Sequence, residues 1–208
     1  AGHLITNKDE IAENFNNFLL ILAPHSLKKI PKANGNIFQY LTRVEKTIFL
    51  RPVQFSEVTK IIKDLKNSSA GWDNIKADIF QLSCIAIAEP FTHICNLSLQ
   101  NGVFPTEMKV AKVCPIFKNG NVMLFVQYRP VSILPVMSKV LEKIMYDRVY
   151  DFLQELEVLY ELQFGFRPNY STYMALAMSV DRITSAVENG DFVPGVFLDF
   201  SKAFDTID

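Results

Sequence analysis

The sequence predicts an α+β fold that is rich in helices and carries one β-ribbon and one strand near its C-terminus. Three observations support this fold class. Several stretches place apolar residues at helical spacing. Two stretches rich in β-forming residues flank a turn, and residues 196–200 alternate as a strand does. Of the 208 residues, 49% are hydrophobic, which is enough to bury a core and argues against a disordered chain.

The first 50 residues are predicted to be a helical and irregular lead-in to the rest of the chain. Residues 11–22 form an amphipathic helix, which Pro24 ends. Residues 24–50 contain Pro31 and Gly35 and have little periodicity. The apolar face of the helix consists of Ile11, Phe15, Phe18, Leu19 and Leu22.

Two helical regions follow this lead-in. Residues 56–66 are predicted to form a helix that begins with Ser56 as its N-cap and buries Val58, Ile61, Ile62 and Leu65. Residues 75–99 are also helical, and Pro90 either kinks this region or divides it into two helices. Asn101 and Gly102 end it. Its expected core residues are Ile79, Leu82, Ile85, Phe91, Ile94 and Leu97.

The pattern then changes to strands. Residues 113–117 and 129–134 flank a predicted turn at residues 118–121, which indicates a two-stranded ribbon with Lys118 and Arg129 at its ends. Pro115 and Pro130 exclude either strand from an uninterrupted central position in a sheet, because proline has no N–H to donate.

Two helices and a strand complete the prediction. Ser138 is expected to cap a helix that reaches about residue 153, and Ser171 or Thr172 opens another helix that Gly190 ends. Residues 196–200 are expected to form a largely buried strand that contains Asp199. A buried carboxylate without a partner costs at least about 2 kcal/mol, so such a residue usually has a cation or a metal beside it. The alternative is an exposed Asp on a half-solvated strand.

The charge of the chain is balanced overall but not locally. The net charge is −1, whereas residues 109–148 contain seven basic and two acidic residues, a local net charge of +5. This stretch is a candidate phosphate-facing surface, and an ordinary solvated face is the alternative. The basic residues are Lys109, Lys112, Lys118, Arg129, Lys139, Lys143 and Arg148.

Cysteine usage and hydropathy bear on the cellular location. The three cysteines form no C-x-x-C pair, so neither a zinc site nor a disulfide framework is indicated. No apolar run reaches the roughly 20 residues that a membrane span needs, and the polar N-terminus is unlike a signal peptide. We expect an intracellular protein of the nucleus or cytoplasm without membrane contact. The chain begins with Ala, so it is expected to be a piece of a longer polypeptide.

Four separated segments give the chain a specific resemblance. They are Ser-Ala-Gly-Trp-Asp at 69–73, Pro-Ile-Phe-Lys-Asn-Gly at 115–120 with Tyr-Arg-Pro-Val-Ser-Ile-Leu at 128–134, Gln-Phe-Gly-Phe-Arg-Pro at 163–168, and Asp-Phe-Ser-Lys-Ala-Phe-Asp at 199–205. In this order, they resemble the front half of the reverse transcriptases of LINE-type (non-LTR) retrotransposons. Ala70 stands where the family usually has proline. The resemblance implies that residues 51–208 are the fingers and an incomplete palm of a right-hand polymerase, truncated after the first catalytic motif.

The same resemblance implies an RNA-directed DNA polymerase that acts on an RNA template, a DNA primer or target and dNTPs. Such an enzyme uses two Mg²⁺ ions, which prefer oxygen ligands. By resemblance, Asp199 is the catalytic metal ligand, and the backbone carbonyl of Phe200 assists it. Lys118 and Arg129 would bind the triphosphate of the nucleotide, and Phe204 would exclude a 2′-hydroxyl. Gln163 and Arg167 would lie near the template or primer, although an alternative role is to anchor the helix that follows them.

Two departures from the family pattern leave other interpretations open. Residues 1–208 contain no Asp-Asp pair, which the family places in a second catalytic motif, so the chain alone is expected to be inactive. Residues 121–127 are more apolar than the usual tip of such a ribbon, which weakens the alignment of Lys118. The alternatives are a non-catalytic remnant that binds nucleic acid through residues 109–148, and a decayed product without a fold or function.

Overall fold

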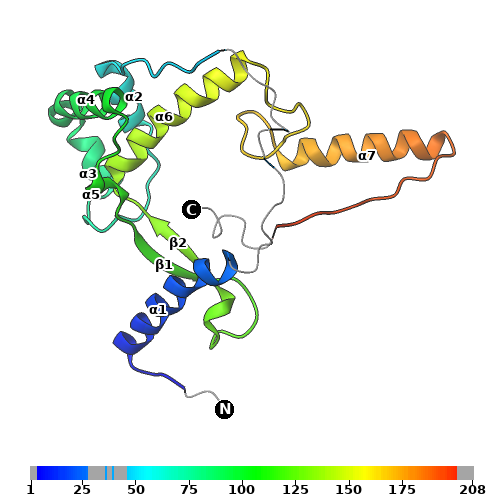
Figure 1. Cartoon of the computed structure of the whole chain (residues 1–208), viewed down its shortest axis with the longest axis horizontal. Coiled ribbons are helices and arrows are strands. Elements are labelled where there is room, and N and C mark those ends of the chain that lie inside the picture. Colours follow the sequence, from blue (N-terminus) through cyan, green and yellow to red (C-terminus); the bar gives the residue numbers. More distant parts are fainter. Residues whose placement is uncertain (1–3, 28–35, 37–38, 40–45, 201–208) are drawn as a thin grey trace. The chain divides into compact units, whose positions relative to one another are not determined.

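A computed structural model describes residues 4–27, 36, 39 and 46–200 (Figure 1). These residues divide into two compact units, one that ends at Val149 and one that begins at Tyr150. The described part is helix-rich with one small antiparallel sheet, so the α+β prediction is confirmed at this level. Within it, no helix is both long and apolar enough to cross a membrane. The helices are α1 (Lys8–Leu27), α2 (Phe55–Lys63), α3 (Ala77–Leu82), α4 (Cys84–Asn101), α5 (Thr106–Lys109), α6 (Val136–Glu155) and α7 (Thr172–Glu188).

Helices α2, α4 and α6 form the core of the first unit. Their apolar side chains are withdrawn from water, and each large one contributes about 1.5–3 kcal/mol through burial. The rings of Phe80 on α3 and Phe91 on α4 meet edge to face, with centroids 5.8 Å apart. The fully buried members of this core include Val58, Ile62, Ala88, Cys95, Val140, Leu141 and Ile144.

The predicted helices α1 and α2 exist, but their ends differ from the prediction. Helix α1 does not stop at Pro24 and reaches Leu27, because a proline removes one helical hydrogen bond without forbidding the helix. The N-cap of α2 is Gln54 in an extended conformation, so Ser56 is not the cap and lies in the first turn. The predicted apolar stripe of α2 is correct, since Val58 and Ile62 are buried.

The region 75–99 is divided into two helices at Ser83, and Pro90 lies inside α4. The Ser83 hydroxyl donates to the carbonyl of Ile79 at 2.9 Å, an alternative to the backbone helix bond. The predicted core face is wrong except at Phe91, since the other buried residues of this region are Ala77, Phe80, Cys84, Ala88, Cys95 and Leu99. The residues that are exposed instead are Ile79, Leu82, Ile85, Ile94 and Leu97. Gly102 ends α4 with φ 65°, as predicted.

Helix α6 begins at Val136, two residues before the predicted cap. Ser138 is fully buried, and its hydroxyl donates to the carbonyl of Met108 at 2.5 Å. Ser138 is therefore a core hydrogen-bond donor rather than an N-cap. Val140, Leu141 and Ile144 are buried as predicted, whereas Val149 is exposed.

The second unit contains α7 and the segment that follows it. Ser171 caps α7 by accepting a hydrogen bond from the Met174 N–H at 3.3 Å, and Gly190 follows the helix with φ 79°, both as predicted. Residues 191–200 have no regular secondary structure and are exposed, so the predicted buried strand at 196–200 is wrong for the structure described. A strand is stable only when neighbouring strands pair with its backbone, and no described residues pair with this segment.

Candidate nucleotide and nucleic-acid interface

Strands β1 (Lys112–Phe117) and β2 (Tyr128–Ile133) form the predicted ribbon. Their register pairs Ile116 with Arg129 and Pro115 with Pro130. The Lys118 N–H donates to the Gln127 carbonyl at 2.9 Å, which extends the pairing by one residue beyond the strands. The connection therefore spans residues 119–126 and is longer than the predicted four-residue turn.

This register explains how two prolines fit into one ribbon. Hydrogen-bonded and non-hydrogen-bonded pairs alternate along an antiparallel ladder, and Lys118–Gln127 is a bonded pair. Two steps of alternation make Ile116–Arg129 a bonded pair and Pro115–Pro130 a non-bonded pair. The ladder loses no bond at the prolines, because the N–H groups that they lack would have pointed away from the partner strand.

The two faces of the ribbon differ in chemistry. Partner residues share a face, so Lys118 and Arg129 lie on the same face, together with Lys112 and the exposed Ile116 and Val131. The opposite face carries Phe117 and Tyr128, whose rings are 5.5 Å apart. The structure thus brings the two predicted triphosphate ligands together on one exposed, basic face.

Helix α1 covers the tip of the aromatic face (Figure 1). The ring of Phe15 lies 4.5 Å from that of Phe125 and 5.0 Å from that of Tyr128. Phe125 belongs to a short 3-10 helix in the apolar connection, so the unusual segment 121–127 supplies a contact for α1. The basic face remains open on the other side of the ribbon.

A loop that begins at Ser68 holds the root of the ribbon. A Cβ added to Gly71 would lie 2.8 Å from the backbone N of Pro135, so only glycine fits this close approach between β2 and α6. The Trp72 indole N–H donates to the carbonyl of Glu107 at 3.2 Å. The motif residues 69–73 therefore join α5, the ribbon and α6.

One of the seven basic residues of the stretch 109–148 is buried, so it cannot be part of an exposed phosphate-facing surface. Arg148 is only 4% exposed and forms a two-pronged ion pair with Glu57, with N–O distances of 2.6 and 2.9 Å. Its Nε also donates to the Arg51 carbonyl at 3.2 Å. The hydrogen bond from Arg148 lowers the pKa of the Glu57 carboxyl below its usual value, against the opposing effect of burial. Arg148 is thus a structural residue, and its place in the apolar phase of α6, four residues after Ile144, was the signal that could have identified it.

Gln163 and Arg167 lie in one loop of the second unit. Gln163 is exposed and donates to the carbonyl of Gly165 at 3.3 Å. The Arg167 guanidinium donates to the carbonyl of Tyr160 at 3.0 Å and stacks on the ring of Tyr170 at 4.2 Å. These contacts brace the loop before α7, in agreement with the anchoring alternative, and the Arg167 Nε is buried with no partner in the described structure.

Asp199 lies in the exposed segment 191–200, and its carboxylate has no hydrogen-bond or ion-pair partner among the described residues. The expected buried carboxylate is therefore wrong for this structure. A carboxylate and the Phe200 carbonyl suit Mg²⁺ in kind, but no three acidic, His or Cys side chains converge anywhere in residues that the structure describes. These residues alone do not form a two-metal site. Phe204 lies outside the described residues.

Comparison with known proteins adds an independent finding. Residues 116–208 match the family described as "Reverse transcriptase (RNA-dependent DNA polymerase)". The whole chain is 29% identical to 23% of "Probable RNA-directed DNA polymerase from transposon BS" of Drosophila melanogaster. A second relative from Drosophila melanogaster is "Probable RNA-directed DNA polymerase from transposon X-element". The match covers 95% of the chain and 21% of that relative, at 29% identity. A stretch of 115 residues, 55% of the chain, is 34% identical to 13% of "RNA-directed DNA polymerase from mobile element jockey" of Drosophila melanogaster. The chain spans less than a quarter of the length of these relatives.

Proposed function

Because the chain carries a reverse transcriptase segment and is homologous to the RNA-directed DNA polymerases of LINE-type retrotransposons, we propose that it supplies the fingers and the start of the palm of such an enzyme. Its substrates are an RNA template, a DNA primer end and dNTPs. Asp199 and the Phe200 carbonyl contribute oxygen ligands to Mg²⁺, which when bound activates the primer 3′-oxygen and holds the triphosphate. Because the described residues do not form a complete metal site, these two groups are proposed as part of the ligand set.

The basic face of the ribbon is the observation that carries this proposal. Lys118 and Arg129 are exposed on one face, and α1 packs against the tip of the other, so the basic face is open to an incoming triphosphate. Lysine offers a point charge and arginine a fork of donors, which together suit the several oxygens of a triphosphate. Phe204 is proposed to select dNTPs over NTPs, and Gln163 and Arg167 to face the template or primer.

Primer extension on an RNA template with Mg²⁺ and dNTPs tests the proposal. The chain would be compared with the same chain extended through about 150 further residues of its reading frame, which is the size of a typical domain. We expect extension by the longer polypeptide, its loss in Asp199→Ala, and a raised KM for dNTP in Arg129→Ala and Lys118→Ala. An unchanged rate in Asp199→Ala would contradict the assigned role of that carboxylate.

A second candidate function is nucleic-acid binding without catalysis. The observation that favours it is that the basic ribbon is a regular paired sheet, whereas the exposed segment that holds Asp199 has no regular secondary structure. This candidate predicts salt-dependent RNA binding that persists in Asp199→Ala. A cooperative melt in circular dichroism must accompany either function, and a chain that does not melt cooperatively would support the decayed product.

A further inference from the structure

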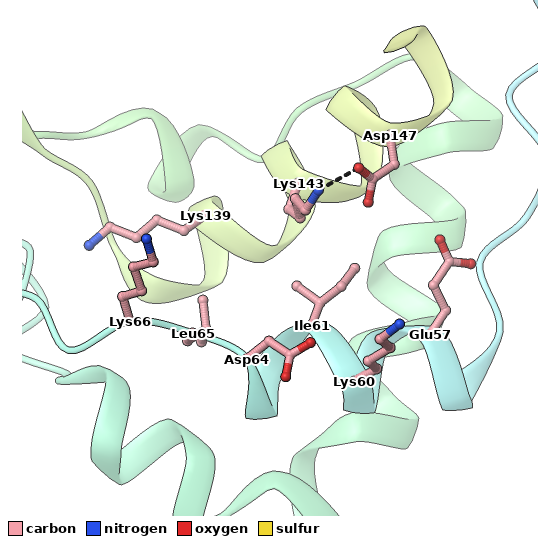
Figure 2. A pocket seen from close by; sticks show the side chains of 9 residues that line it. All are labelled: Glu57, Lys60, Ile61, Asp64, Leu65, Lys66, Lys139, Lys143 and Asp147. Carbon is pink, nitrogen blue, oxygen red and sulfur yellow. Dashed lines mark hydrogen bonds and ion pairs between the residues drawn. The ribbon is translucent and has the colours of Figure 1, made fainter. Parts of the chain in front are cut away.

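A groove of about 550 Å³ lies between α2 and α6 in the first unit, and no role has been assigned to it (Figure 2). Ile61 and Leu65 of α2 form its apolar part, and four lysines line its sides. These are Lys60 and Lys66 from α2 and the loop after it, and Lys139 and Lys143 from α6. The groove is therefore apolar in the middle and has both lysines and acidic residues around it, with one more lysine than acidic residues.

Among the described residues, ion pairs occur at one end of the groove but not at the other. At the first end, Glu57 pairs with Arg148, and Lys143 pairs with Asp147 at 2.5 Å. At the opposite end, Lys66 and Lys139 both line the groove (Figure 2). Neither of these ammonium groups forms an ion pair with a carboxylate of the described residues. Asp64, farther along the groove, is the remaining acidic residue of its lining.

The end with the unpaired lysines is built from positioned groups. Lys139 is half-buried on α6 and donates to the Ser68 hydroxyl at 2.7 Å. Ser68 belongs to the loop that Gly71 and Trp72 fix against the ribbon root and α5. Lys139 and Ser68 are therefore positioned groups, and Lys66 adds a second, exposed ammonium group to the same lining. Glu142, on the same helix as Lys139, balances part of this charge.

We propose that this end of the groove binds a backbone phosphate of an RNA strand. Two lysines supply point charges and Ser68 a further donor, and Ile61 and Leu65 offer an apolar surface for the neighbouring ribose or base. Charged side chains line most of this groove, and the lysines among them suit the phosphates that repeat along a strand. The choice of RNA rests on the proposed function, and the site itself rests on the geometry of α2, α6 and the loop at Ser68.

The test is fluorescence anisotropy with a labelled single-stranded RNA and the full 208-residue chain, at several KCl concentrations. The double variant Lys66→Gln/Lys139→Gln should bind about tenfold more weakly at 0.1 M salt, and its salt slope should fall by about 1.4, because each lost phosphate contact on a single strand removes about 0.7. Lys63→Gln/Lys76→Gln is the matched control, since both lysines are exposed and neither lines the groove or the ribbon. Equal losses in the two variants, or no loss in either, would overturn the inference.

A second measurement does not depend on substitutions. RNA should protect Lys66 and Lys139 from acylation in the wild-type chain and leave Lys63 and Lys76 reactive, whereas equal protection of all four contradicts the site.

The anisotropy titrations repeated with dNTP as a competitor separate the two sources of phosphate, a strand and a free nucleotide. If dNTP displaces the labelled RNA as strongly as unlabelled RNA does, the choice of a strand is overturned. Variants Lys118→Ala and Arg129→Ala, tested alongside, separate this inference from the proposed function. If they bind dNTP normally while the groove variant loses RNA, the triphosphate role of the ribbon fails and the groove site stands.

Discussion

The helical layer of the first unit and residues 191–200 of the second unit are both rich in large apolar residues, but only the layer buries them. Val58, Ile62 and Ile144 in the layer are fully buried. Phe197 is 97% exposed and Val196 82% exposed in the segment. Helix α2 packs against α4 and α6, whereas residues 196–200 stay exposed and pair with no strand of the described residues. Apolar sequence therefore creates local structure only where a complementary surface is present.

One charged residue in each region shows the same difference in burial. Arg148 is buried in the layer because Glu57 and the Arg51 carbonyl satisfy its donors. Asp199 in the segment is solvated and has no partner in the described structure. Arg148 is thus part of the fold, whereas the Asp199 carboxylate is open to solvent.

The largest expected effect comes from removing the buried charge. Arg148→Ala should lower the free energy of unfolding by about 2–4 kcal/mol, because it leaves Glu57 unpaired and a space between α2 and α6. Chemical denaturation followed by circular dichroism measures this change. Lys143→Ala is the control, since it breaks a surface pair of the same helix and should cost less than about 1 kcal/mol. Equal costs for the two variants would show that burial of Arg148 adds nothing.

The next effect concerns the glycine at the root of the ribbon. Gly71→Ala should cost about 1–3 kcal/mol, because the new Cβ would meet the backbone of Leu134 and Pro135, which cannot rotate away. Gly165→Ala is the matched substitution in the second unit, where no atom lies within 4 Å of an added Cβ. It should leave the melting temperature unchanged or raise it slightly. A Gly71→Ala protein as stable as the wild type would contradict the close approach.

A smaller effect is expected from pH. Arg148 lowers the pKa of Glu57 from its usual 4.5, so the folded chain binds this proton less readily than the unfolded chain. The resulting stabilisation is present above pH 4.5 and is lost as the pH falls through the lower, folded pKa. Glu57→Gln should therefore show a weaker decline in melting temperature below pH 4.5 than the wild type. Parallel declines would indicate that other carboxylates dominate acid unfolding.

Sequence reasoning succeeded where local chemistry decides the structure. The Ser171 cap, the turns at Gly102 and Gly190 and the ribbon depend on neighbouring residues, and all were predicted. The hydrogen bond from Ser138 reaches Met108, 30 residues away in sequence, and it was missed. The division at Ser83 was also missed, although the hydrogen bonds of this hydroxyl are local. The same distinction applies to the site. Alternation along a strand predicts that Lys118 and Arg129 share a face once the register is known, but no local rule predicts where Asp199 finds further ligands.

The smallest expected effect on stability comes from Asp199→Ala. Its side chain is exposed and contacts no described partner, so the melting temperature should stay within the change expected for about 0.5 kcal/mol. If the same variant abolishes primer extension by the longer polypeptide, the loss must arise from chemistry rather than from unfolding. A clear loss of stability would instead show that Asp199 has a structural partner when the chain is in solution. Asp199 would then resemble Arg148, as a charged residue that the fold holds in place.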